Sequence, residues 1–186
     1  MTTQTKLRTK DLTDIALFAV AITVCSWISI PMVIPVTMQT FGVFLAVGVL
    51  GGKRGTMAVL TYLLMGLIGL PVFSGFSGGI GALAGATGGY IVGFVLSALV
   101  MWAMEAMLGR STAVLAASMA LGLAVCYFFG TVWFMAVYAR QTGTIGVWSA
   151  LTMCVFPYVI PDGVKIALAL VVRKRICKAL RTEAEG

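Results

Sequence analysis

The sequence contains no histidine, only six acidic residues and four widely spaced cysteines. Without histidine it has neither a Ser-His or Cys-His catalytic pair nor a histidine metal site. No C-x-x-C motif is present, which argues against a zinc site or a disulfide framework and indicates small buried side chains. Those cysteines are Cys25, Cys126, Cys154 and Cys177. The sequence therefore indicates a protein that is not an enzyme and has no cofactor.

Apolar residues are abundant instead. They make up 60% of the 186 residues, charged residues make up 10%, and the mean hydropathy is +1.05. A soluble domain has roughly 45–50% apolar and about 25% charged residues. Most of the chain must therefore meet lipid, and we predict an all-α integral membrane protein. The net charge of +7 is typical of the positive-inside rule and does not indicate nucleic-acid binding.

Apolar runs of the sequence predict six transmembrane helices. The second run is short, so we expect its helix to begin within the preceding segment PVTMQT. Residues 147–160 are cut by Pro157 and Pro161 and predict a short amphipathic or re-entrant helix. The expected spans are 12–30, 41–52, 56–70, 90–108, 113–138 and a helix that starts at Pro161 and ends in the basic run 173–181.

The basic residues predict how these spans are oriented. Eleven of the thirteen lysines and arginines fall in the two tails and in the second–third and fourth–fifth connections. Only Arg140 lies on the other side, and Lys165 lies within a span. This asymmetry predicts that both termini are cytoplasmic. The expected organisation is an amino tail (1–11), a six-helix membrane domain (12–180) and a carboxyl tail (181–186).

Small residues recur at every fourth position from Ser77 to Ser97, with glycines at 81, 85, 89 and 93 between them. One interpretation is close helix packing along a single stripe. The alternative is that bare backbone approaches a ligand, which is tolerated at membrane depth where it lines a cavity. Gly88 lies off the stripe, so packing should make no demand on it. The run has neither the Gly-Lys-Ser/Thr of a P-loop nor the context of a dinucleotide fingerprint.

Asp162 and Lys165 form the clearest ionisable pair within apolar sequence. Residues three apart share a helix face, so the pair should point into the bundle. It is either an intrahelical salt bridge near a helix start or a functional site. The ligand of such a site should carry a carboxylate for Lys165, N–H donors for Asp162 and an apolar body.

Other polar or aromatic residues have plainer interpretations. Glu105 and Arg140 are further candidates, but we expect solvation at the interface and in a loop. Tyr127 and Trp133 lie deep in the fifth span and either stack on a ligand ring or pack in the core.

Three segments resemble the BioY family, the biotin-binding S-components of energy-coupling-factor (ECF) vitamin transporters. They are IPVTMQTFGVFLAVGVLGGKRG (34–55), LLMGLIGLPVFSGFSGGIGALAGATGGYIVGF (63–94) and PYVIPDGVKIALAL (157–170). The resemblance implies a multi-pass S-component bundle in the bacterial cytoplasmic membrane that binds biotin with high affinity. It also implies partners, namely a coupling transmembrane protein and two ATPase subunits.

The first helix is the expected contact with that coupling protein, through Ala16, Ala19 and Ala21. The family's A-x-x-x-A signature is not strict here, because Val20 follows Ala16 where a second alanine would stand. In the run that resembles the family's G-P-T-G-G-Y, Ala86 replaces the proline.

Biotin fits the demands of the charged pair, since it has a carboxylate, two ureido N–H groups and an apolar ring. We expect Lys165 to hold the carboxylate and Asp162 either to accept a ureido N–H or to orient Lys165. The candidate ligand-binding residues are Asp162, Lys165, Tyr90, Gly85, Thr87, Gly88, Gly89, Gln39 and Thr40. Three alternatives stay open: a stand-alone biotin carrier, either monomeric or homo-oligomeric, an intramembrane enzyme, and a purely structural membrane protein.

Overall fold

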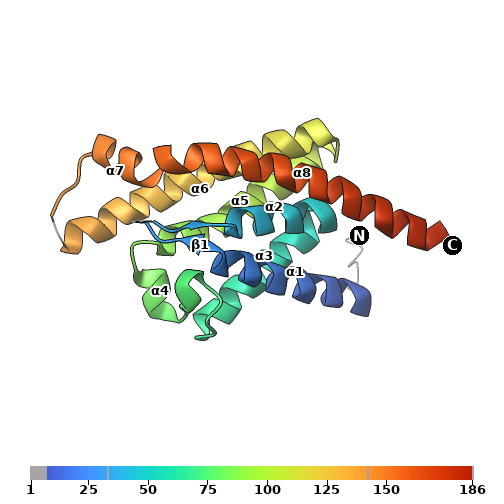
Figure 1. Cartoon of the computed structure of the whole chain (residues 1–186), viewed down its shortest axis with the longest axis horizontal. Coiled ribbons are helices and arrows are strands. Elements are labelled where there is room, and N and C mark those ends of the chain that lie inside the picture. Colours follow the sequence, from blue (N-terminus) through green and yellow to red (C-terminus); the bar gives the residue numbers. More distant parts are fainter. Residues whose placement is uncertain (1–7, 33, 142, 186) are drawn as a thin grey trace, which may run out of the picture.

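The computed structural model describes residues 8–32, 34–141 and 143–185, with side chains through residue 179. The described chain is mostly helical, as predicted, and its helices form an elongated bundle (Figure 1). Strands β1 (Ser29–Ile30) and β2 (Val36–Thr37) pair antiparallel, and a 3-10 turn, η1, covers Ser74–Phe76. The helices are α1 (Thr9–Trp27), α2 (Gln39–Leu50), α3 (Gly52–Leu67), α4 (Ile80–Ala84), α5 (Gly88–Leu108), α6 (Thr112–Gln141), α7 (Val147–Cys154) and α8 (Phe156–Glu185).

Fewer than six of the described helices are both long enough and apolar enough to cross a membrane. In the described residues, α5 and α6 are long and apolar enough to cross, and α7 with α8, bent by 40° at their junction, would make a third. The remaining long helices fall short for local reasons. Lys10, Asp11 and Asp14 occupy the start of α1, and the 12 residues of α2 rise only about 18 Å against a hydrocarbon core of about 30 Å.

Helix boundaries differ from expectation most clearly at α8. We expected the last helix to start at Pro161, but it begins at Phe156 and contains Pro161. Pro161 has no backbone N–H, so α8 lacks the hydrogen bond that this position would donate to the carbonyl of Pro157. The short helix expected within 147–160 is present as α7. α8 also continues through residues 181–185, which we expected to form a tail.

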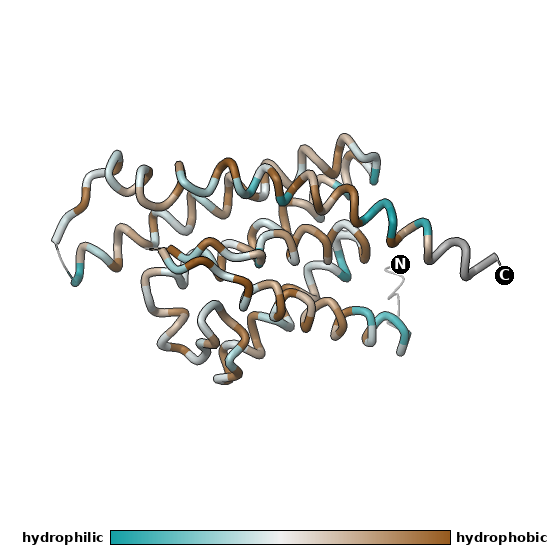
Figure 2. Tube along the Cα trace, viewed as in Figure 1, coloured by the Kyte–Doolittle hydropathy of each residue, from teal (hydrophilic) through white to brown (hydrophobic). Residues whose placement is uncertain are grey.

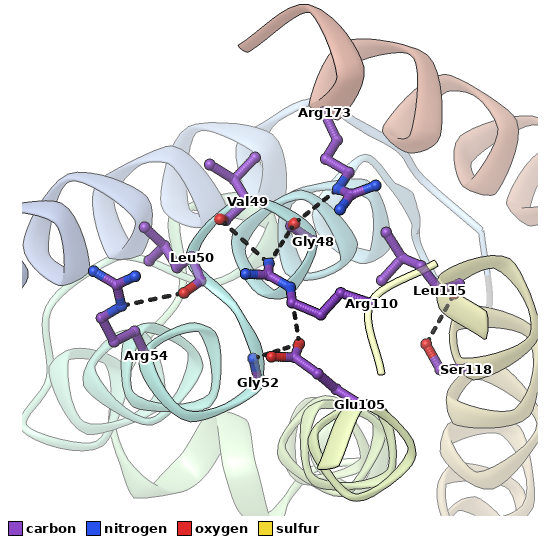
Figure 3. Close-up of polar contacts among 10 residues, drawn as sticks. All are labelled: Gly48, Val49, Leu50, Gly52, Arg54, Glu105, Arg110, Leu115, Ser118 and Arg173. Carbon is purple, nitrogen blue, oxygen red and sulfur yellow. Dashed lines mark hydrogen bonds and ion pairs between the residues drawn. The ribbon is translucent and has the colours of Figure 1, made fainter. Parts of the chain in front are cut away.

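Gly51 separates α2 from α3 with a left-handed φ of 88°. This break leaves carbonyl groups at the end of α2 without helical partners. The carbonyl oxygen of Gly48 accepts hydrogen bonds from Arg110 Nη2 at 3.0 Å and Arg173 Nε at 3.1 Å. Figure 3 shows both guanidinium groups converging on this helix end. Two arginines from outside the helix therefore cap α2.

Glu105 caps the other side of the same break. Its Oε2 accepts the backbone N–H of Gly52, at the first residue of α3, at 2.9 Å and lies 3.5 Å from Arg110 Nε (Figure 3). Only 24% of the Glu105 side chain is exposed. We expected a solvated carboxylate, but the free amide created by the break gives it a partner within the bundle.

The structure divides the ladder of small residues. Ser77, Gly81 and Gly85 lie in or beside α4 and its loop, so only Gly89, Gly93 and Ser97 share a helix. A Cβ on Gly89 would lie 2.2 Å from the Cβ of Trp133. On Gly93 it would lie 2.9 Å from Cys126 Sγ, so both glycines let α5 approach α6. The packing interpretation therefore holds for Gly89 and Gly93, but the ladder is not a single continuous stripe.

Gly88 has a packing role of its own, contrary to our expectation. A Cβ there would lie 1.6 Å from the carbonyl oxygen of Leu83, where the chain turns from α4 into α5. Glycine at this position is therefore required by the fold.

The first helix presents only part of its expected contact surface. Ala16 is exposed and Ala21 is half-buried, but Ala19 is completely buried in the core. Val20 is 52% exposed and lies one turn from Ala16 on the same face. Ala16 and Val20 are thus both outward on this helix, together with Leu12, Leu17 and Val24.

Replacing Gly89 with alanine should destabilise the protein. The added methyl group would overlap Trp133, and such overpacking costs about 1–3 kcal/mol. Gly81→Ala is the matched control, because a Cβ on Gly81 meets nothing within 4 Å. In thermal melts of the purified protein, Gly89→Ala should lower the Tm and Gly81→Ala should leave it near the wild-type value. Equal melting temperatures for both variants would contradict close packing at Gly89.

Candidate functional site

A cavity opens between the β1–β2 hairpin, the start of α2, the loop around η1, and helices α5, α6 and α8. Its empty space, including the open mouth, is about 730 Å³. Apolar and aromatic side chains form most of the wall, with a few polar groups among them. The lining residues are Ile34, Pro35, Thr37, Gln39, Thr40, Phe73, Ser74, Ser77, Thr87, Tyr90, Ile91, Phe94, Cys126, Tyr127, Cys154, Tyr158, Asp162 and Lys165.

Asp162 lies at the centre of a hydrogen-bond network in this cavity. Its Oδ1 accepts the Thr40 hydroxyl at 3.0 Å and Lys165 Nζ at 2.6 Å, and its Oδ2 accepts the Tyr127 hydroxyl. The donors come from α2, α6 and α8 respectively for Thr40, Tyr127 and Lys165. An ionised carboxylate has about four acceptor positions, so three of them are filled. Asp162 is thereby fixed in position by three helices.

Lys165 keeps hydrogen-bonding capacity toward the cavity. The side chain is 8% exposed, so its ammonium group is almost entirely removed from bulk water. Nζ carries three N–H groups, and among the described residues Asp162 is its only hydrogen-bond partner. Two N–H donors of a buried cation therefore remain for a molecule in the cavity. A carboxylate is the natural partner of such a group.

Gln39 and Tyr90 also place polar groups at the wall. Gln39 donates an amide N–H to the Tyr62 hydroxyl at 2.7 Å, and its side-chain oxygen has no partner among the described residues. The Tyr90 hydroxyl lies 3.0 Å from Thr131 Oγ1, which holds the ring against the cavity. The wall thus offers an amide acceptor and a fixed aromatic face to a ligand.

The structure brings together six of the nine candidate residues. Those that line the cavity are Asp162, Lys165, Tyr90, Thr87, Gln39 and Thr40. Gly85, Gly88 and Gly89 are not among the lining residues. Gly88 and Gly89 pack against Leu83 and Trp133, and the carbonyl of Gly85 accepts the Trp133 indole N–H at 3.0 Å.

Several residues of the wall are not among the candidates predicted from the sequence. Tyr158 lies one turn before Asp162, so the i, i+4 spacing was a usable signal for it. Its hydroxyl donates to the carbonyl of Ile34 and ties α8 to the β1–β2 connection. Phe73 and Cys154 had no such signal, because the fold brings them to the cavity from a loop and from α7. Of the two aromatic residues considered in the fifth span, Tyr127 lines the cavity.

Comparisons of the sequence with a family model and with known proteins agree on one family. The model of the BioY family matches residues 1–182. The chain is 39% identical to "Biotin transporter BioY" of Thermotoga maritima over 91% of this chain and 96% of that one. It is 37% identical to "Probable biotin transporter BioY" of Pyrococcus horikoshii over 91% and 98%.

A solved structure has the same fold. It is described as the S-component for biotin from an ECF-type ABC transporter and superposes with a TM-score of 0.81 at 25% identity. The match covers 93% of this chain and 95% of the other. With the family match over nearly the whole sequence, this places the chain in the BioY family.

Proposed function

We propose that this chain binds biotin in the cavity and takes it up across the membrane as the S-component of an ECF-type transporter. Relatives that match this chain over nearly their full length are described as a biotin transporter and a probable biotin transporter. The observation that carries the proposal is the pair of free N–H donors on buried Lys165, facing a cavity with apolar walls. Biotin offers a carboxylate to the cation, ring N–H groups to an acceptor, and an apolar ring to the aromatic side chains.

Within the site, Lys165 binds the carboxylate and Asp162 acts mainly by orienting Lys165. The support for this division is that three donors already bind the Asp162 carboxylate. Gln39 then becomes a candidate acceptor for a ureido N–H, because its side-chain oxygen lacks a partner among the described residues. Tyr90 and Thr87 contribute to the wall beside the ring.

The membrane arrangement we propose has six crossings, with both termini in the cytoplasm of a bacterial cell. The short helices α2 and α3 would form part of this arrangement beside the longer α5 and α6. The distribution of lysines and arginines supports it, since nearly all lie in segments that this topology places on one side. The membrane domain is then 12–180.

The proposed partners are a coupling membrane protein and two ATPase subunits. The exposed face of α1, with Ala16 and Val20 one turn apart, is the candidate contact with the coupling protein. Ala21 is half-buried at its border, whereas the buried Ala19 supports the helix from behind.

Transport with and without the coupling module separates the partnered mechanism from a stand-alone or homo-oligomeric carrier. We expect rapid biotin uptake by cells that produce this chain with a cognate module, and little uptake without the ATPases. A wild-type rate of uptake in cells lacking every module would contradict the partnered mechanism while leaving biotin binding intact.

Lys165→Met should bind biotin poorly. A charge-assisted hydrogen bond contributes about 1.5–3 kcal/mol, so the affinity should fall roughly ten- to a hundredfold. The variant should also discriminate less between biotin and biotinamide, which lacks the carboxylate. Equilibrium binding of both ligands to the wild type and the variant gives this comparison. If the variant prefers biotin over biotinamide as strongly as the wild type does, the carboxylate is bound elsewhere in the protein.

A double substitution tests the orienting role of Asp162. If Asp162 acts only through Lys165, then Asp162→Asn combined with Lys165→Met should bind biotin no more weakly than Lys165→Met alone. If Asp162 binds the ureido group directly, the two losses in binding free energy should add. Affinities of the four proteins in this cycle, measured by equilibrium binding, decide between the roles.

A further inference from the structure

From Val164 onward, α8 has an outward face that does not line the proposed biotin cavity. Val164, Leu168 and Val171 are 63%, 42% and 52% exposed. Their spacings of four and three residues place them on one stripe of the helix. The next steps of the same stripe are Arg175, which is exposed, and then Lys178. An apolar stripe therefore ends in positive charge.

The two adjacent cations at this point, Lys174 and Arg175, are both exposed. Within the part of the chain that the structure describes, neither has a hydrogen-bond or ion-pair partner. Residues 163–179 of α8 contain no acidic residue to neutralise them. Arg173 differs, since its guanidinium caps α2 at Gly48. The pair at 174 and 175 is thus available to an external anion.

The surroundings of this pair are strongly basic. Arg54 and Arg110 bind carbonyl groups at the end of α2, as Arg173 of α8 does, so they lie near this part of α8 (Figure 3). Lys53 precedes Arg54 in α3, and Figure 2 shows hydrophilic residues near the end of α8. Asp11 forms an ion pair with Arg54 at 2.7 Å. Glu105 accepts a hydrogen bond from the backbone N–H of Gly52 and forms an ion pair with Arg110. Each of these two acidic side chains offsets one arginine. Lys53, Arg173, Lys174 and Arg175 have no acidic partner among the described residues, so they leave a net positive charge near α8.

The length of the stripe matches one leaflet of a bilayer. Eleven residues separate Val164 from Arg175, which is about 16 Å of helix rise. Half of the hydrocarbon core is about 15 Å. An acyl chain lying along Val164, Leu168 and Val171 would place its phosphate beside Lys174 and Arg175. A soluble anion would use the two cations but would leave the apolar stripe without a role.

We propose that this face of α8 binds an anionic phospholipid, with its phosphate held by Lys174 and Arg175 and an acyl chain along the apolar stripe. Near an anionic surface each such cation contributes about a fivefold increase in affinity. The site is separate from the biotin cavity, because Arg175 lies ten residues, or about 15 Å, beyond Lys165 along the helix. The proposal therefore does not rest on biotin binding.

Retention of phosphatidylglycerol and phosphatidylcholine by the purified full chain, measured by native mass spectrometry over a range of lipid concentrations, tests the proposal. The wild type should prefer phosphatidylglycerol, and the preference should weaken with salt. Lys174→Gln and Arg175→Gln should each lower the affinity for phosphatidylglycerol about fivefold, and the double variant about thirtyfold. Affinity for phosphatidylcholine should fall less, because its choline cation already offsets the charge of its phosphate.

Lys53→Gln is the matched control, because it removes one exposed cation from the same end of the bundle but from α3. It should cost less than either substitution on α8, and circular dichroism melts should show that all variants fold. An equal loss in Lys53→Gln would reduce the effect to general attraction by the basic end and overturn the site. Wild-type affinity in the double variant, or displacement of the lipid by inorganic phosphate at equal concentration, would also overturn it.

Discussion

The ion pair between Asp162 and Lys165 is the interaction on which the rest of the site depends. Both side chains are almost completely buried, where an uncompensated charge would cost several kcal/mol. The pair becomes tolerable because Thr40 and Tyr127 donate to the same carboxylate and because Lys165 faces a cavity. A buried pair of this kind is weak support for stability, but it gives a fixed cation to an anionic ligand.

At the opposite end of α2, polar groups inside the bundle are also paired, but there the pairing satisfies backbone groups and does not prepare a ligand site. There the break at Gly51 exposes backbone groups, and Arg110, Arg173 and Glu105 bind them. α2 and α8 are therefore linked at two places, by Thr40 with Asp162 in the cavity and by Gly48 with Arg173 at the basic end. These two contacts place the start of α2 at the cavity wall and keep its short length aligned with α8.

The sequence predicts this architecture unevenly, for physical reasons. Hydropathy and the i, i+3 spacing identified the helical class and the pair at Asp162 and Lys165, because both are local properties. Periodicity alone does not show that the chain turns between Gly85 and Gly88, so it is equally compatible with one continuous stripe of small residues. The partners of Glu105 are not predictable from the sequence either, since the free amide of Gly52 exists only where two helices meet at a break. Thr40 and Tyr127 reach Asp162 across 122 and 35 residues, separations that no local pattern encodes.

Direct location of the ligand tests the central claim. A structure of the protein determined with biotin present should show the molecule in the cavity lined by Tyr90, Tyr127 and Asp162. A carboxylate oxygen should lie within hydrogen-bond distance of Lys165 Nζ, with the Asp162–Lys165 contact kept. Biotin bound outside this cavity, or bound inside it with its carboxylate turned away from Lys165, would contradict the account.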